Sequence, residues 1–294
     1  MTISVATHGA LVAAGLDPTF VAELARAAVA EDLAGGVDVT TSATVPAGQR
    51  ARLELTARRA GIAAGVPVAA AVYDVVGAGS CQAEMLVADG TAVTAGTVLL
   101  SITGPVADLL VAERTSLNLL GHLSGIATLT SFWVRAVAGT QAAIRDTRKT
   151  TPGMRSLEKY AVRCGGGVNH RMSLSDAALV KDNHVVAAGG VAAAFEAVRT
   201  KWPDLAVEVE VDSLDQLDEV LAAGADLVLL DNFTTDEMTE AVARTAGRAR
   251  LEASGGLTLD TAAEVAATGV DYLAVGALTH SAPVLDIGAD LVPL

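Results

Sequence analysis

The alternation of apolar and polar positions changes part-way along the chain. Between Arg50 and Pro105, stretches such as "ARLELTARRAG" alternate with a period of two, which is typical of half-buried strands. Turn signals at Asp89-Gly90 and Ala95-Gly96 divide "AEMLVADGTAVTAGTVLLSITG" into two or three short strands. An apolar helical period covers residues 62–76. This region therefore predicts an antiparallel sheet with helices, which is an α+β domain.

From about Asp108 the pattern predicts repeated strand–helix units. "DLLVAERTSLNLLGHLSGIATLTSFWVRAVA" has the period of a long amphipathic helix, with a candidate interruption between Gly121 and Gly125. Six short apolar strands follow and alternate with helices, as in α/β folds. A closed α/β barrel has eight strands, so either two are hidden or the barrel is incomplete. The six are "AAIRD", "AALVKDN", "AVEVEVD", "DLVLLDN", "RLEASGG" and "YLAVGA"; the helices between them are "RSLEKYAVRC", "VAAAFEAVRT", "LDQLDEVLAAG", "DEMTEAVART" and "LDTAAEVAATG".

Each of these strands ends in polar residues or glycine. The C-terminal ends of parallel strands open on one face of the sheet, and active sites form there. We therefore expect one mouth lined by residues that are distant in sequence. In strand order these are Arg145, Arg148 and Lys149; Lys181, Asp182 and Asn183; Glu210 and Asp212; Asp231 and Asn232; Ser254, Gly255 and Gly256; and Gly276.

The glycine-rich ends of the last two strands predict a phosphate site. Glycine lets backbone N–H groups approach phosphate oxygens closely, and a helix N-terminus adds favourable partial charge. "SGG" precedes a helix expected from Thr258, and Gly276 lies in "VGA". The alternative for each glycine is an ordinary turn.

The strand "VEVEVD" places Glu208, Glu210 and Asp212 on one side. Carboxylates inside a barrel need partners of positive charge. The candidates are the cations of the first two strand ends, a Mg²⁺ ion, or a positive charge that develops on a substrate. A polar outer face on an edge strand is the alternative. The buried character of the neighbouring strands favours the interior.

The charge distribution predicts a small anionic ligand. Acidic residues outnumber basic ones 34 to 20, which argues against nucleic-acid binding and against an anionic membrane as a partner. Residues 145–181 nevertheless hold eight Lys and Arg residues. Arg pairs bidentately with carboxylate or phosphate, whereas Lys acts as a point charge. The anion-binding candidates are Arg145, Arg148, Lys149, Arg171 and Lys181, whereas Arg155, Lys159 and Arg163 fit a solvated helix face near Glu158.

Histidine and cysteine give no metal-ligand spacing. His170 precedes Arg171 in a glycine-rich loop, where it could hydrogen-bond a carboxylate or be plain surface. Cys81 and Cys164 are expected to be reduced thiols in a cytoplasmic protein, and the N-terminus lacks the basic start of a signal peptide. The apolar stretch "GIAAGVPVAAAVYDVVGAG" contains Pro67 and Asp74, so a buried helix is expected there and not a membrane span.

Seven motifs resemble the quinolinate phosphoribosyltransferase family and occur in the same order over nearly the whole chain. They are "EDLAGGVDVTT", "ERTSLNLLGHLSGIATLT", "RDTRKTTPGMRSLEKYAVRCGGGVNHRMSLSD", "LVKDNH", "VEVEVDSLDQ", "LLDNF" and "EASGGL". The family decarboxylates quinolinate while it makes nicotinate mononucleotide for NAD biosynthesis.

The resemblance implies an α/β plus α+β fold with an N-terminal α/β sandwich and an incomplete, six-stranded α/β barrel. We expect the sandwich at 1–117, the catalytic barrel at 118–280, and a segment at 281–294 that returns to the N-terminal domain. It also implies a homodimer in which an arginine matched by Arg114 reaches the partner's site.

The resemblance also implies the roles of the site residues. Those matching the quinolinate site are Arg114, Arg148, His170, Arg171 and Lys181. Those matching the phosphoribosyl pyrophosphate site are Lys149, Glu210, Asp231, Ser254, Gly255, Gly256 and Gly276. Lys149, Glu210 and Asp231 are the expected catalytic residues, Mg²⁺ accompanies the sugar donor, and no protein ligand of a metal is assigned.

Three other functions stay open. A sibling transferase acting on nicotinate or another base would share the phosphate half of the site, although nicotinate has one carboxylate and needs fewer cations. A Schiff-base aldolase or isomerase would use Lys149 or Lys181. A regulatory module would sense a phosphorylated metabolite without catalysis.

Overall fold

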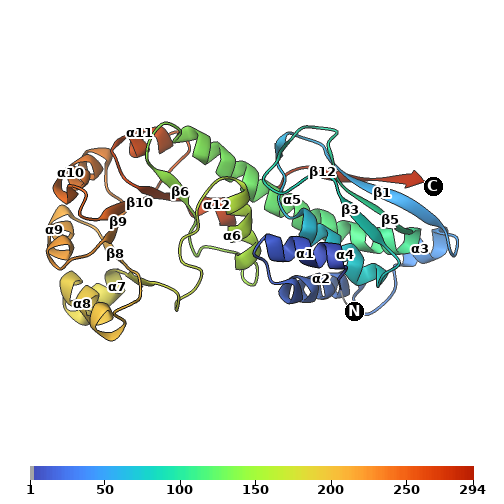
Figure 1. Ribbon diagram of the computed structural model, residues 1–294, viewed down its shortest axis with the longest axis horizontal. Coiled ribbons are helices and arrows are strands. Elements are labelled where there is room, and N and C mark those ends of the chain that lie inside the picture. Colours follow the sequence, from blue (N-terminus) through green and yellow to red (C-terminus); the bar gives the residue numbers. More distant parts are fainter. Residues whose placement is uncertain (1–2) are drawn as a thin grey trace. The chain divides into compact units, whose positions relative to one another are not determined.

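The computed structural model describes residues 3–294, which form two compact units (Figure 1). The first unit holds the chain up to Leu129 together with Ser156–Gly165 and Ser281–Leu294. The second holds Thr130–Arg155 and Gly166–His280. Domain limits at 117 and 280 stay a prediction.

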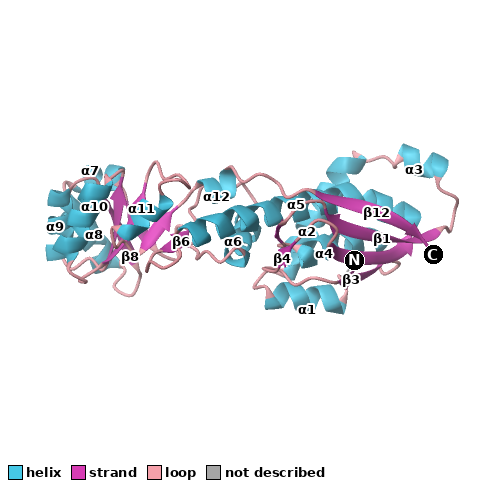
Figure 2. Ribbon diagram, turned by 90° about the horizontal axis from the view of Figure 1, so that it is seen from above, coloured by secondary structure: helices cyan, strands magenta, loops and turns pink. Residues whose placement is uncertain are grey.

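The first unit is built on a four-stranded antiparallel sheet in the order β12-β1-β5-β3, seen as magenta arrows in Figure 2. β12 runs along β1 over its full length, so the C-terminal segment is an edge strand of this sheet. The strands are β1 (Arg50–Ala57), β3 (Gln82–Met85), β5 (Val98–Pro105) and β12 (Ile287–Pro293), and β2 (Gly61–Ile62) and β4 (Ala92–Val93) form a separate pair.

Helix α4 (Val66–Gly77) packs against this sheet and supplies much of the core. It is buried along almost its whole length, which agrees with the expectation of a buried helix in this apolar stretch. Within the described residues 3–294, no helix is both long enough and apolar enough to cross a membrane. The unit also contains α1 (Val5–Ala13), α2 (Pro18–Leu33), α3 (Val39–Thr44) and α6 (Arg155–Cys164).

The long helix α5 (Val106–Ala136) is continuous through Gly121 and Gly125, so the expected interruption is wrong. The two glycines serve close packing instead. A Cβ on Gly125 would lie 2.2 Å from the carbonyl oxygen of Pro283, and the backbone N–H of Leu285 donates to the carbonyl oxygen of Gly121 at 2.9 Å. Glycine here lets the C-terminal segment lie directly on the helix.

The second unit contains a six-stranded parallel sheet in the order β6-β11-β10-β9-β8-β7. Six strands are confirmed, and because β6 and β7 are the ends of the strand order, the barrel is incomplete. The strands are β6 (Ala143–Arg145), β7 (Ala178–Val180), β8 (Val207–Val211), β9 (Leu227–Asp231), β10 (Arg250–Ser254) and β11 (Tyr272–Ala274).

Helices connect these strands and cover the outer side of the sheet (Figure 1). Sequence signals set where they start: Ser213 caps one helix by accepting from the N–H of Gln216, and Thr234 and Glu237 form a capping box on the next. The helices are α7 (Asp182–Ala188), α8 (Val191–Lys201), α9 (Leu214–Ala222), α10 (Thr235–Thr245), α11 (Ala262–Ala267) and α12 (Ala277–His280).

Helix α6 begins and ends where its pattern predicts, but the interpretation of its charged face is wrong for Lys159. Glu158 and Lys159 both have 0 % exposed area, while Arg163 is exposed. Every residue from Leu157 to Val162 is buried, so neighbouring elements surround this helix on more than one side. Glu158 lies 2.9 Å from His122 Nε2, a partner that a buried carboxylate needs.

Both cysteines are free thiols. Burial raises the pKa of Cys164 to about 11 and also raises the pKa of Cys81. Little thiolate therefore forms at neutral pH, which agrees with structural and not catalytic cysteines.

Candidate active site

The C-terminal ends of the six parallel strands surround a cavity of about 380 Å³ in the second unit. The topology predicted this mouth, because parallel strands present their C-terminal ends on one face. Eight of the predicted site residues line it: Arg148, Lys149, His170, Arg171, Lys181, Glu210, Asp231 and Ser254.

Three cations enter the cavity from three different segments. Arg148 follows β6, Arg171 lies in the loop before β7, and Lys181 follows β7. Burial and then the charge of Arg148 lower the pKa of Arg171. The Nε atoms of Arg148 and Arg171 are buried and have no hydrogen-bond partner among the residues the structure describes. An anion would satisfy both their charge and their N–H donors.

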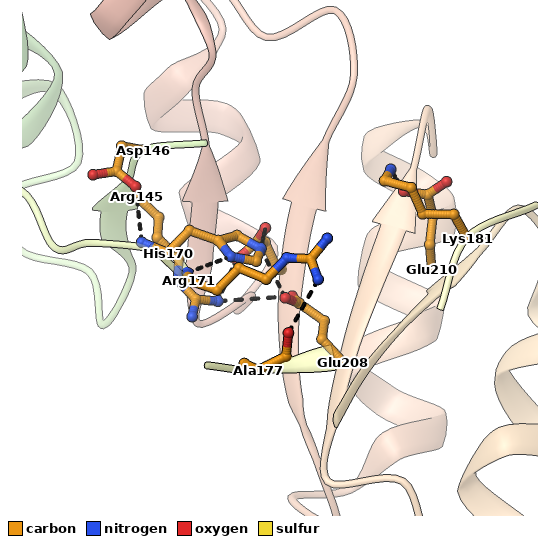
Figure 3. A network of polar contacts seen from close by, with 9 residues as sticks. Arg145, Asp146, His170, Arg171, Ala177, Lys181, Glu208 and Glu210 are labelled. Carbon is orange, nitrogen blue, oxygen red and sulfur yellow. Dashed lines mark hydrogen bonds and ion pairs between the residues drawn. The ribbon is translucent and has the colours of Figure 1, made fainter. Parts of the chain in front are cut away.

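Two carboxylates lie at the ends of neighbouring strands. Glu210, near the end of its strand, forms a salt bridge with Lys181 (Figure 3), a cation from one of the two strand ends that the sequence analysis offered among the alternatives. Asp231 accepts a hydrogen bond from Asn232 Nδ2 at 2.9 Å. Asp212, on the same predicted side, is exposed and does not line the cavity.

The glycine turn after β10 is tightly constrained. Gly255 has φ +91°, and a Cβ there would lie 2.1 Å from Asn232 Oδ1. The backbone N–H of Asn232 donates to the carbonyl oxygen of Ser254 at 2.9 Å. Gly256 has φ +60° with open space around it. The following helix begins at Ala262 and not at Thr258, so any anion binding here rests on backbone N–H groups of the turn.

Gly276 follows β11 and lies against Lys149. A Cβ on this glycine would be 2.9 Å from Lys149 Cδ, and Thr279 Oγ1 donates to the carbonyl oxygen of Lys149 at 2.8 Å. Gly276 therefore makes room for the lysine side chain. A larger residue here would have to displace the Lys149 side chain.

A layer of charged side chains, termed the floor, adjoins the cavity through His170 and Glu252. Glu208, Glu252 and His170 are buried and Arg145 is partly buried; Figure 3 shows the contacts in this layer. Arg145 Nη1 lies 2.6 Å from Glu252 Oε2 and 3.7 Å from Glu208 Oε1, and its guanidinium stacks on Tyr272 at 4.8 Å. Arg145 is therefore paired inside the protein, although the sequence made it an anion-binding candidate. His170 Nε2 lies 2.8 Å from Glu208 Oε2.

Sequence reasoning missed Glu252 and Asp146 in this layer. Both have 0 % exposed area. A charged residue in the middle of "RLEAS" was the same signal that singled out Glu208. Burial, followed by the negative charge of Glu208, raises the pKa of Glu252 to about 8. The site floor thus holds two carboxylates that resist simultaneous ionisation.

A metal ion fits one group of carboxylates better than another. His170, Glu208 and Glu252 offer ligand atoms within 4.8 Å of one another, but Arg145 already neutralises that group and an imidazole is not a typical Mg²⁺ ligand. Glu210 and Asp231 provide oxygens at the cavity wall. The residues at the wall therefore fit Mg²⁺, which prefers oxygen ligands and retains waters or phosphates.

Arg114 belongs to the first unit. It is exposed on α5 and lines a cavity of about 270 Å³ with Glu31, Asp32 and Asn118. Arg114 is not among the residues that line the cavity of the second unit.

Two sequence models match almost the whole chain. The N-terminal domain of quinolinate phosphoribosyl transferase matches residues 38–124, and the C-terminal domain of the same family matches residues 126–290. The chain belongs to the quinolinate phosphoribosyl transferase family. The resemblance of the motifs is thereby confirmed, as is the fold class.

Several named members of this family are similar to this chain over most of their own length. Nicotinate-nucleotide pyrophosphorylase [carboxylating] of Mycobacterium leprae is 55 % identical over 90 % of this chain and 95 % of its own. A solved structure of NadC from Streptococcus pyogenes is 40 % identical, with a TM-score of 0.90 over 95 % of this chain and 99 % of its own. The nicotinate-nucleotide pyrophosphorylase structure from Francisella tularensis is 37 % identical, with a TM-score of 0.88 over 93 % and 96 %.

Human nicotinic acid phosphoribosyltransferase is a more distant structural neighbour. It has a TM-score of 0.61 and 14 % identity, with 86 % of this chain and 72 % of its own covered. At this identity the likeness shows a shared fold alone. The quinolinate phosphoribosyl transferase family, by contrast, is identified by sequence over both domains.

Proposed function

We propose that this protein transfers the phosphoribosyl group of phosphoribosyl pyrophosphate to quinolinate, with loss of CO₂. The products are nicotinate mononucleotide, pyrophosphate and CO₂. The enzyme is a pentosyltransferase of pyridine nucleotide and NAD biosynthesis. The family and the names of its close relatives support this reaction.

One observation carries the choice of substrate: three cations from separate segments meet at one cavity. Quinolinate has two carboxylates, and Arg148, Arg171 and Lys181 offer enough positive charge for both. The two unpartnered Nε atoms of the arginines add directed donors. Nicotinate, with one carboxylate, would leave part of this charge without a partner.

The phosphoribosyl pyrophosphate site lies on the other strand ends of the same cavity. Lys149 and the Ser254–Gly256 turn would hold phosphate oxygens through an ammonium group and backbone N–H groups. Because Gly276 has no side chain, it leaves room for the side chain of Lys149. Glu210 and Asp231 would accept hydrogen bonds from the ribose hydroxyls.

The carboxylates would also stabilise the charge that develops during the reaction. Departure of pyrophosphate leaves positive charge on ribose C1, and Glu210 and Asp231 lie at the cavity wall where they can face it. The pyridine nitrogen then attacks C1. The carboxylate on the adjacent ring carbon departs as CO₂, the electron pair of the broken bond stays on that carbon beside the positively charged nitrogen, and a proton from water takes the place of the carboxylate. No side-chain nucleophile is required, so catalysis rests on positioning and electrostatics.

Mg²⁺ would be held by Glu210 and Asp231 together with the phosphates of the donor. It would supply positive charge that neutralises the leaving pyrophosphate. Lys149 would act on the same leaving group as a fixed cation.

We also propose that the active form is a homodimer in the cytoplasm, in which Arg114 reaches the partner's quinolinate site. Two facts support this: Arg114 matches the family's arginine in "ERTS", and its guanidinium is exposed. An exposed cation on one subunit can add to the positive charge of another without any rearrangement of the fold.

A direct assay tests the reaction. The protein is incubated with quinolinate, phosphoribosyl pyrophosphate and Mg²⁺, and CO₂, pyrophosphate and nicotinate mononucleotide are measured. Equimolar formation of all three supports the proposal. Turnover of nicotinate in preference to quinolinate, or no release of pyrophosphate, would contradict it.

Two variants test the assigned roles. Lys149→Ala and Glu210→Ala should each lower kcat by about 100-fold or more, because each removes a charge that acts on the transition state. Arg244→Ala is the control, since Arg244 pairs with Asp218 and Glu240 and does not line the cavity. Near-normal rates in both charge variants would rule the mechanism out.

A further inference from the structure

Both ring nitrogens of His170 are engaged inside the protein. The side chain is 8 % exposed, and Nε2 lies 2.8 Å from Glu208 Oε2. The backbone N–H of Arg171 donates to Nδ1 at 2.7 Å. An N–H donor can approach only an unprotonated ring nitrogen, so the ring proton is on Nε2 and points at the carboxylate. The contacts thus specify the neutral tautomer.

We infer that Glu208 and His170 are positioning residues for Arg171. In this role the neutral His170 ring orients Arg171 and adds no positive charge to the site. Glu208 holds the Nε2–H tautomer. Nδ1 of that tautomer then fixes the backbone of Arg171, whose guanidinium lies at the cavity. This inference rests on the proposed function, in which Arg171 binds a carboxylate of quinolinate.

Further hydrogen bonds hold His170 and Arg171 in place. The backbone N–H of His170 donates to Asp146 Oδ1 at 2.8 Å, which anchors the histidine from the side opposite its ring. Arg171 Nη1 donates to the carbonyl oxygen of Ala177 at 3.0 Å (Figure 3). The guanidinium is therefore fixed at one end by a carbonyl and at its backbone by the imidazole.

Arg145 also contacts Glu208, on the carboxylate whose other oxygen faces the imidazole. Its guanidinium lies 3.7 Å from Glu208 and 2.6 Å from Glu252, so one cation faces both buried carboxylates. Glu252 Oε1 is a further 3.6 Å from His170 Nε2. A cation this close offsets part of the cost of burying the Glu208 carboxylate, which is 3 % exposed.

Pairs of substitutions at His170 and Glu208 test the positioning role. In each pair one variant keeps the hydrogen-bond acceptor and the other removes it. In His170→Asn the side-chain oxygen can replace Nδ1 as acceptor for the Arg171 N–H, whereas His170→Leu cannot. Similarly, the amide oxygen of Glu208→Gln can accept from Nε2–H, whereas Glu208→Leu cannot. We expect both Leu variants to raise KM for quinolinate about tenfold or more, the equivalent of one lost hydrogen bond.

The conservative variants should raise that KM less than about threefold, and KM for phosphoribosyl pyrophosphate should change less than about twofold in all four. A purely structural role would raise both KM values alike and lower the melting temperature in proportion. Equal effects of the Asn and Leu variants at His170, or an unchanged KM for quinolinate in both Leu variants, would overturn the inference.

The tautomer can be measured without turnover. In ¹⁵N-labelled wild-type protein we expect His170 Nδ1 to resonate as an unprotonated nitrogen and Nε2 as a protonated one at neutral pH, with no change on adding quinolinate alone. The same tautomer is expected in Glu208→Gln. A doubly protonated ring, or the opposite tautomer, contradicts the inference even if the Leu variants fail to fold.

This measurement also separates two kinds of failure. If quinolinate is not a substrate but the tautomer is as expected, the proposed function fails and the geometry stands. If quinolinate is turned over normally and His170 is the imidazolium, the proposed function stands and the positioning role fails.

Discussion

At the scale of single residues, the site contains cations that are paired with carboxylates and cations that face the cavity. Lys181 and Glu210 pair at the cavity wall, while Arg145 pairs with Glu252 in the floor. The two arginines that face the cavity keep unpartnered Nε atoms among the described residues. Arg145 therefore serves the fold, whereas Arg148 and Arg171 keep donors for a substrate, and Lys181 lines the cavity while it pairs with Glu210.

Glu252 should make stability depend on pH. Its pKa is raised to about 8 by burial and by Glu208, against an ordinary value near 4.5. The folded protein therefore retains a proton that the unfolded chain has lost. The free energy of unfolding should be highest below about pH 4.5 for this group and fall as pH rises toward 8, by up to about 1.4 kcal/mol per pH unit.

Urea denaturation at several pH values measures this slope. Glu252→Gln imitates the protonated carboxyl, so its slope between pH 5 and 8 should be flatter than that of the wild type. A slope that is identical in the two proteins would show that Glu252 is ionised throughout this range.

Gly255 and Gly256 should respond differently to alanine. Both have positive φ, which costs an alanine roughly 1 kcal/mol. Only at Gly255 would the added Cβ collide, at 2.1 Å from Asn232 Oδ1. Gly255→Ala should therefore move the turn and raise KM for phosphoribosyl pyrophosphate by about tenfold or more, and Gly256→Ala much less. Steady-state kinetics decide, and a larger effect at Gly256 would refute the assignment of the turn.

At the scale of elements, periodicity predicted the positions of strands and helices well. It predicted less well which other elements pack against them. All six parallel strands lie within their predicted stretches, and α6 has its predicted limits. The burial of Lys159 was not predicted, because periodicity reports the face that prefers the core and not how many elements cover a helix. The same limit explains the continuous α5, where glycine marks close packing rather than a break.

Gly125 therefore gives an unusual prediction for a helix interior. Gly→Ala normally stabilises a helix by up to about 1 kcal/mol. At Gly125 the Cβ would lie 2.2 Å from the Pro283 carbonyl oxygen, so Gly125→Ala should destabilise by about 1–3 kcal/mol. Gly9 in α1 is the matched control, since a Cβ there has nothing within 4 Å.

Thermal unfolding of the two variants gives the comparison. Gly9→Ala should raise the melting temperature slightly, and Gly125→Ala should lower it. If both raise it, the contact between α5 and the C-terminal segment is looser than the distances indicate.

At the scale of the whole molecule, a shared site predicts complementation between inactive subunits. If Arg114 acts on the partner's site, a mixed dimer of Arg114→Ala and Lys149→Ala has one intact site. Random mixing should then restore about a quarter of wild-type activity, since about half of the dimers are mixed and each has one working site of two.

The control uses two variants of the same site. Lys149→Ala mixed with Glu210→Ala should restore no activity. In such a mixed dimer one site lacks Lys149 and the other lacks Glu210, so neither site is intact. If mixed dimers form and the first mixture recovers no activity, Arg114 does not act between subunits. Sedimentation or light scattering verifies that dimers form.

The sequence by itself determined the two kinds of domain, the six parallel strands and the polar residues at their ends, because hydrophobic period and strand polarity are local properties that topology turns into one mouth. Only the tertiary structure decided how those charges are divided. Arg145 is bound to Glu252, Lys181 to Glu210, and the His170 ring to Glu208 and Arg171. Such pairings depend on distances between strands that adjoin in space and not in sequence, and burial makes a partner necessary for Glu208 and Glu252.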